Sequence, residues 1–170
     1  MGVYSPIYLG DDHENPTRLD AMDVLGDVAW SQLSVALTQK STGRWRVKFT
    51  RPGRYRFELR RWPRELGLSL GDTLEKEGIS KLAPFADAVR SDEGTAWKET
   101  GETKALAPQK AKLEFFGAQF EAEASGGQAG AVFSLPVEQT GETDLSACFV
   151  DQNGEETGAY YVYVEWLESL

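Results

Sequence analysis

Residues 44–65, RWRVKFTRPGRYRFELRRWPRE, decide the fold, because two alternating segments lie here on either side of a Pro-Gly pair. In residues 44–49 and 54–59, aromatic and aliphatic side chains alternate with charged ones. This period of two indicates strands that each bury one face, and Pro52-Gly53 between them is a strong turn signal. We therefore expect the two segments to form an antiparallel hairpin whose outer face is mostly arginine.

Further short segments with the same alternation follow in the second half of the chain. They occupy residues 111–116, 118–124, 131–137, 143–150 and 158–167. The stretch DQNGEET between the last two segments contains Asn-Gly, which predicts that these two segments form a hairpin. Near the start of the chain, residues 6–10 and 16–20 are expected to be short edge strands on either side of a polar loop.

Many short strands joined by turns are typical of two antiparallel sheets packed face to face. We therefore predict a single all-β domain over residues 1–170, a two-layer antiparallel β-sandwich. Its inner faces are expected to hold Trp45, Phe57, Leu113, Phe133 and Phe149, with several Tyr and Val residues of the last strand. Residues 66–110 do not alternate, and Gly78 and Pro84 would end any helix there, so we expect one long, partly helical insertion.

Charge is distributed unevenly along the sequence. Residues 44–64 hold nine basic side chains against one acid, Glu58, and so carry +8 in a chain whose net charge is -9. The remainder then carries -9 minus 8, or -17, so the basic block has many carboxylates available for pairing. The acidic average disfavours a nucleic-acid partner, and no apolar run of about 18 residues is present to span a membrane.

No pattern for covalent, acid–base or metal chemistry stands out. His13, the only histidine, lies in the polar stretch GDDHENP and is expected at the surface. Cys148, the only cysteine, has no second thiol to pair with and is expected to be a small core residue. Asp11, Asp12 and Glu14 lack the spacing of calcium ligands, and DQNGEE lacks the later bidentate Glu of a calcium loop. We therefore predict no catalytic residue and no metal ligand.

Ordered motifs in this chain resemble the C-terminal region of bacterial arylsulfatase-like enzymes. A Gly-x-Trp-x-Val strand (43–47) leads through Gly-x-Tyr (53–55) to Leu-Arg-Arg-Trp-Pro-x-Glu (59–65). After a long variable segment, the last strand reads Gly-Ala-Tyr-Tyr-Val-x-Val (158–164). With the upstream stretch GDDHENPTRL, these motifs span nearly the whole chain. The resemblance implies a periplasmic or secreted parent protein that hydrolyses sulfate esters.

The same resemblance implies that the catalytic domain is absent from this chain. Sulfatases of that class use a formylglycine, made from the first residue of a Cys/Ser-x-Pro/Ala-x-Arg signature, beside a calcium ion in an α/β domain. Cys148 is followed by Phe-Val-Asp-Gln, so it does not belong to such a signature. The chain alone is thus expected to be non-catalytic and without a cofactor, and formylglycine and calcium are expected only in the catalytic domain, its partner in cis.

The basic block supplies the candidate contact residues. These are Arg60, Arg61, Trp62 and Arg64 of the motif, and Arg44, Arg46, Arg54 and Arg56 of the two strands, which alternation would place on one face. Arginine forks pair bidentately with sulfate and carboxylate groups, so one hypothesis is contact with a sulfated glycan. The other is that the guanidinium groups pair with acids of this chain or of the catalytic domain. Trp62 is either a platform for a sugar ring or a packed side chain.

Three functions remain open on these grounds. The first is a non-catalytic accessory domain that packs on a sulfatase catalytic domain and helps bind its sulfated substrate. The second is an independent carbohydrate-binding module for acidic or sulfated glycans. The third is a purely structural domain.

Overall fold

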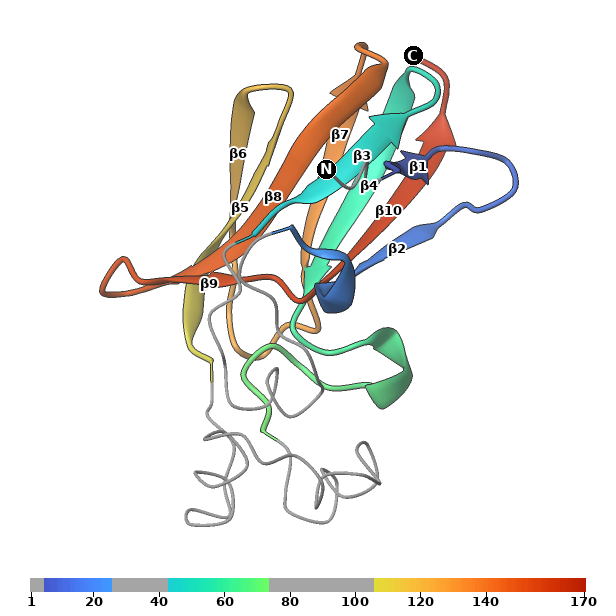
Figure 1. Ribbon diagram of the computed structural model, residues 1–170. Helices are drawn as coiled ribbons and strands as arrows, with labels where there is room; N and C mark the ends of the chain where they lie inside the picture. Colours follow the sequence, from blue (N-terminus) through green and yellow to red (C-terminus); the bar gives the residue numbers. More distant parts are fainter. Residues whose placement is uncertain (1–4, 26–42, 74–105) are drawn as a thin grey trace.

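The computed structural model describes residues 5–25, 43–73 and 106–170, and almost all regular structure in these ranges is β-strand. Two mainly antiparallel sheets pack face to face (Figure 1), so the prediction of an all-β sandwich is confirmed. Most of the expected insertion, residues 74–105, lies outside the described residues. Within them, no helix is both long and apolar enough to cross a membrane.

The first sheet has six strands, and β1 is parallel to its neighbour β3. Its order is β1 (Ile7–Leu9), β3 (Trp45–Phe49), β8 (Gly141–Asp151), β5 (Pro108–Phe115) and β6 (Ala118–Glu123), with β9 (Glu156–Gly158) paired to β8. The second sheet has the order β2 (Thr17–Asp20), β10 (Tyr161–Glu168), β4 (Gly53–Arg60) and β7 (Ala131–Val137). Two short 3-10 helices, η1 (Ala21–Asp23) and η2 (Arg64–Leu66), follow β2 and β4. The two predicted edge strands are thus confirmed as β1 and β2.

The expected hairpin of β3 and β4 is wrong. Strand β3 pairs with β1 and β8, whereas β4 pairs with β10 and β7 in the other sheet. The Pro52-Gly53 connection therefore crosses between the layers, and the Tyr55 hydroxyl fixes it by donating a 2.6 Å hydrogen bond to the Arg51 carbonyl. A side chain at Gly53 would collide with Trp166 and the Glu168 carbonyl, so the crossing requires glycine.

The hairpin predicted for residues 143–150 and 158–167 is correct in its turn but wrong in its second strand. The chain does turn at Asn153-Gly154, where the Asp151 carboxylate accepts hydrogen bonds from the backbone N–H groups of Asn153 (2.8 Å) and Glu155 (3.0 Å). However, the strand that returns beside β8 is the short β9, and β10 crosses to the other sheet to lie between β2 and β4. The predicted segments 111–116 and 118–124, in contrast, correspond to β5 and β6, which pair directly as an antiparallel hairpin around Gly117.

The main core lies between the two sheets and contains most of the predicted inward residues, with Val162 and Val164 from the last strand. The tyrosines of that strand, also expected inside, belong to a second cluster. Phe49, Tyr55, Phe57 and Phe115 form its centre, with ring centroids 5.2–6.4 Å apart. Such edge-to-face and stacked aromatic contacts add to the free energy gained by burial. Cys148, expected in this core, is instead half-buried on the outer face, because the alternation of β8 turns its neighbours Ala147 and Phe149 inward.

A second, smaller cluster covers part of the four-stranded sheet. It contains Ala21, Trp62, Tyr160, Tyr161 and Tyr163, against which Leu66 and Leu68 pack. Residues 61–72 carry the chain from the end of β4 over this cluster, and we refer to them as the strap. The strap is joined to residues 126–128 by two backbone hydrogen bonds, from Leu70 N to the Gln128 carbonyl (2.7 Å) and from Gly71 N to the Gly126 carbonyl (2.9 Å).

Candidate functional site

Glu58, on the outer face of β4, is the centre of the arginine-rich region. Its carboxylate accepts from Arg56 (2.9 Å), Arg60 (2.9 Å) and Arg64 (3.0 Å), and its side chain is only 8% exposed. Burial alone would raise the pKa of Glu58, but the three guanidinium hydrogen bonds, led by that from Arg64, lower it to about 2. Glu58 is therefore a carboxylate at neutral pH, and three arginines share its charge.

Arg60 connects this carboxylate to the strap. Beyond its bond to Glu58, its Nε donates to the Trp62 carbonyl at 3.1 Å and its Nη2 donates to the Leu68 carbonyl at 3.5 Å. All three nitrogens of the guanidinium thus have acceptors within the chain. Since the side chain is buried, Arg60 acts here as a structural crosslink between β4 and the strap.

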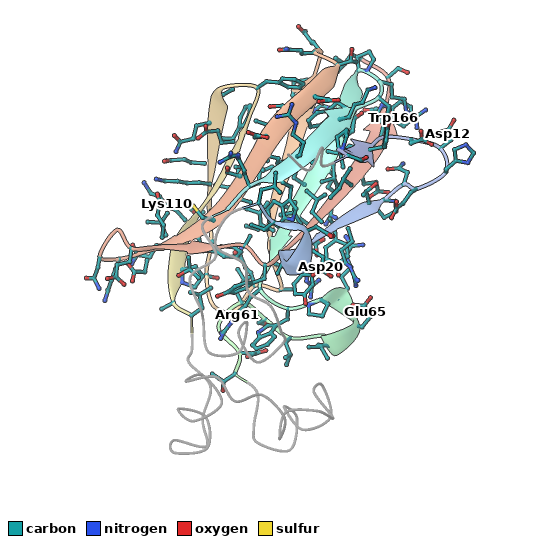
Figure 2. The ribbon with its side chains drawn as sticks, in the orientation of Figure 1. Asp12, Asp20, Arg61, Glu65, Lys110 and Trp166 are labelled. Carbon is teal, nitrogen blue, oxygen red and sulfur yellow. The ribbon has the colours of Figure 1, made fainter. Side chains whose placement is uncertain are left out.

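Arg61, which Figure 2 labels, is fully buried and donates to backbone carbonyls. Its Nη1 lies 3.0 Å from the Asp72 carbonyl and 3.5 Å from the Leu70 carbonyl, and its guanidinium lies 4.6 Å from the centre of the Trp62 ring. Burial lowers the pKa of Arg61 to about 10, although Tyr160 and Asp72 oppose this shift. The group remains charged at neutral pH and holds the far end of the strap.

Trp62 is packed inside the second cluster. Only 1% of its surface is exposed, and its indole Nε1 donates to the Asp72 carbonyl at 3.2 Å. The Asp72 side chain closes the strap by accepting a 2.7 Å hydrogen bond from the Ser69 N–H. The packed alternative for Trp62 is therefore the one observed, and its ring offers no face to a sugar.

Arg64 is the most exposed of the four motif residues, with 38% of its side chain accessible. Its backbone N–H donates to the Tyr163 hydroxyl at 3.0 Å, and its guanidinium stacks 4.2 Å from the centre of the same ring. The hydrogen bond to Glu58 raises the pKa of Arg64. Arg64 is thus held in one position while part of its guanidinium faces solvent.

An open groove of about 520 Å³ lies beside Arg64, between β2, η1 and η2. Its charged lining consists of Arg18 and Arg64 with Glu14, Asp20, Asp23 and Glu65. Arg18 is already paired, at 3.4 Å with Asp20 and at 3.6 Å with Glu65. Because four carboxylates outnumber two guanidinium groups, the groove disfavours a sulfate group.

Arg46 on β3 and Arg44 directly before that strand lie on the other sheet and bind different partners. Arg44 pairs with Asp144 at 2.9 Å, and Arg46 pairs with Glu142 at 3.1 Å and with Asp144 at 3.4 Å, all of them well exposed. Arg54, at the opposite end of β4 from the motif, lies 3.9 Å from Glu168. The expected single arginine face is therefore wrong, since the sandwich places Arg44 and Arg46 on its opposite side.

The structure thus brings together five of the eight predicted contact residues. They are Arg56, Arg60, Arg61, Trp62 and Arg64. Sequence reasoning missed the residues that organise them, namely Glu58, Tyr163 and the carbonyl of Asp72. For Glu58 a signal existed, because it is the single acid of the basic block.

The polar loop between β1 and β2 is held by local contacts. Asp11 accepts from the backbone N–H of His13 at 2.9 Å, and Asp12 pairs with Arg51 at 3.0 Å. In residues 5–25, 43–73 and 106–170, no group of three or more His, Cys, Asp or Glu side chains is placed to hold a metal ion.

Comparison with known proteins gives one distant structural neighbour. No family model and no curated protein matches this sequence. Among solved structures, a ruminal GH26 endo-β-1,4-mannanase is similar over 91% of this chain, with 12% identity and a TM-score of 0.41. This chain spans 26% of the length of that mannanase chain. A similarity this low carries no statement about function.

Proposed function

We propose that this chain is a non-catalytic accessory domain of a sulfatase-like sulfuric ester hydrolase, which packs on the catalytic domain. The observation that carries the proposal is the structural role of the motif Leu-Arg-Arg-Trp-Pro in this fold. Through this motif the sequence resembles sulfatase C-terminal regions. All three of Arg60, Arg61 and Trp62 are buried. Arg60 donates to Glu58 and to the strap, and Arg61 and Trp62 both donate to the Asp72 carbonyl at the end of the strap, as expected of residues that the domain's own fold requires.

Our proposed contact with the catalytic domain is the outer face of the four-stranded sheet. Arg54, Arg56 and Arg64 are each partly exposed there, and Val132 on the neighbouring strand β7 is 48% exposed. Arginine is enriched at protein interfaces, and exposed apolar side chains favour burial by a partner. Glu58 already fixes two of these arginines, so ordering them on binding costs little conformational entropy.

Two measurements test this proposal. The reading frame upstream of residue 1 should encode a domain with the Cys/Ser-x-Pro/Ala-x-Arg signature, and a frame without a sulfatase domain there or in a neighbouring gene would contradict it. The purified chain should release no sulfate from an aryl sulfate, whereas the protein that includes the upstream domain should. Measurable turnover by the chain alone would also contradict the proposal.

The contact surface is tested by charge reversal. In sedimentation or affinity measurements with the separately expressed catalytic domain, Arg64→Glu and Val132→Glu should weaken association at least about tenfold. Arg44→Glu on the other sheet is the matched control and should leave association unchanged. Equal effects of Arg44→Glu and Arg64→Glu would remove our assignment of the face.

An independent module for acidic or sulfated glycans is the second candidate, favoured by the exposure of Arg44 and Arg46. It predicts salt-sensitive binding of dextran sulfate that Arg44→Ala and Arg46→Ala abolish. Both arginines already pair with carboxylates of β8, so a sulfate group would have to displace those acids. If neither glycan nor catalytic domain binds, a purely structural role is left.

A further inference from the structure

We propose that a pocket on the outer face of the six-stranded sheet binds one uncharged, hydroxyl-rich sugar ring. The pocket lies over β5, β6, β8 and β9, on the opposite side of the sandwich from Glu58. Its polar lining consists of Lys112, Glu114, Gln119, Ser146, Cys148 and Glu156. This inference does not rest on the sulfatase proposal, because it concerns a different face and a different ligand.

The strand register brings these side chains into one patch. Lys112 lies opposite Cys148, and Glu114 lies opposite Ser146 on one side and opposite Gln119 on the other. Neighbouring strands are about 4.8 Å apart, so the side chains from β6, β5 and β8 form a compact grid. Lys110, which precedes Lys112 by two residues and so shares its face, marks this side of the sheet in Figure 2. The backbone ladder therefore fixes the relative positions of the Cα atoms that carry these side chains.

Three of the lining side chains have free hydrogen-bonding capacity. In the part of the chain that the structure describes, Glu114, Gln119 and Ser146 make no side-chain hydrogen bond or ion pair, although all three line the pocket. Together they offer a carboxylate, an amide and a hydroxyl, which supply both donors and acceptors. A sugar hydroxyl also donates and accepts, so vicinal hydroxyl groups match this set.

The other polar groups define the charge and the size of the ligand. Lys112 and Glu156 form a 2.9 Å ion pair at the pocket edge. Burial, with a contribution from Glu156, raises the pKa of the Cys148 thiol to about 11, so the thiol is neutral at physiological pH although Lys112 opposes the shift. One ammonium and two carboxylates give a net charge that repels sulfate and carboxylate groups.

The dimensions of the pocket favour a single ring. Its volume of about 260 Å³ lies just below the roughly 300–1,000 Å³ of sites for drug-sized ligands. None of the described lining residues is aromatic, so binding relies on hydrogen bonds rather than on stacking. Because these bonds replace bonds to water, we expect weak affinity with clear dependence on individual polar side chains.

The test is a titration of the full 170-residue chain, labelled with ¹⁵N, with methyl β-glucoside, methyl β-galactoside and methyl α-mannoside. At least one glycoside should shift amide resonances of β5, β6 and β8 saturably, while β4 and β10 remain unaffected. The same glycoside should slow alkylation of Cys148, which is the only cysteine and lies in the pocket. Gln119→Ala and Ser146→Ala should each weaken binding at least about threefold, and the double variant at least about tenfold.

Matched controls come from exposed residues outside the pocket. Gln109→Ala, on β5, and Ser134→Ala, on β7, remove the same chemical groups and should leave the titration unchanged. The inference is overturned if none of the three glycosides binds, if glycerol or a sulfated glucose gives the same or a stronger response, or if the Gln119 and Ser146 variants bind like the wild type.

Discussion

Arg44 and Arg46, around the start of β3, and Arg56 and Arg60 of β4 have almost the same sequence pattern but different environments. On β4, Arg60 is buried and shares Glu58 with two further arginines. Arg46 on β3 and Arg44 directly before it extend from the surface toward carboxylates that are themselves exposed. The difference arises because the strap covers the end of β4, whereas no segment of the described chain covers β3 in the same way.

This contrast shows that positive charge in a sequence block has no single function. Breaking a buried, hydrogen-bonded ion cluster leaves charges without compensation, whereas an exposed pair exchanges its partner for water or another anion at little cost. The arginines around Glu58 therefore stabilise the fold, whereas Arg44 and Arg46 can exchange their carboxylate partners for water or another anion. The following predictions test whether the two groups differ as much as their geometry indicates.

The largest effect is expected from Glu58→Gln. This change leaves three guanidinium groups without their shared carboxylate and should lower the free energy of unfolding by about 3–5 kcal/mol. Glu142→Gln removes one of the two carboxylate partners of Arg46 on the other sheet and should cost about 0–1 kcal/mol. Urea unfolding of both variants measures the contrast, and similar losses for the two would show that the Glu58 cluster contributes no more to stability than the Arg46–Glu142 pair.

Acid should reveal the same cluster. Folding lowers the pKa of Glu58 to about 2, so its contribution is complete above the unfolded pKa and is lost as pH falls toward the folded value. With an unfolded pKa near 4.3, the wild type should lose about 2–3 kcal/mol more than Glu58→Gln between about pH 5 and pH 2. Parallel stability curves for the two proteins over that range would contradict the assignment.

Removing Arg61 should have an intermediate effect. Arg61→Leu takes a donor from the carbonyls of Leu70 and Asp72 and should cost about 1–3 kcal/mol, because the Leu70 carbonyl loses this donor and the Asp72 carbonyl keeps only the Trp62 indole N–H. Arg44→Leu, the exposed counterpart, should change stability by no more than about 0.5 kcal/mol. Thermal unfolding compares the two, and a neutral Arg61→Leu would mean that the strap does not depend on this side chain.

The smallest effect concerns the salt dependence of the ion pairs. A double-mutant cycle on Arg46 and Glu142 should give a coupling energy of about 0.2–1 kcal/mol that decreases as salt is added. The equivalent cycle on Arg60 and Glu58 should give a larger coupling that salt changes little, since the pair is buried. Equal salt sensitivity of the two coupling energies would argue against the proposed difference between the buried and the exposed arginines.

The sequence predicts the faces of strands better than their partners. Alternation in residues 54–59 correctly places Tyr55, Phe57 and Leu59 inside, because the side-chain period of a strand is a local property. Whether Pro52-Gly53 makes a hairpin or a crossing depends on the distant residues that cover it, such as Trp166. Cys148 was a misread signal, since Leu145 and Phe149 already set the phase of β8.

In the candidate site, too, the sequence predicts local features but not contacts between distant segments. The sequence indicates that Arg60, Arg61 and Trp62 belong together, because they are adjacent. It does not indicate that Tyr163 lies against Arg64, since 99 residues separate them and no motif links them. The pocket over Ser146 and Gln119 likewise depends on the pairing of three strands, which no local pattern specifies.

Hydrogen exchange at arginine side chains tests the central claim most directly. Arg60 Nε–H donates to the Trp62 carbonyl in a buried site, whereas Arg46 lies at the surface. We predict that exchange of the Arg60 Nε–H, measured by NMR, is slowed at least about a hundredfold relative to that of Arg46, and that added sulfate leaves it unchanged. Exchange of the Arg60 Nε–H as fast as that of Arg46, or a sulfate-dependent shift of its resonance, would contradict the conclusion that the motif's charge is used within the fold.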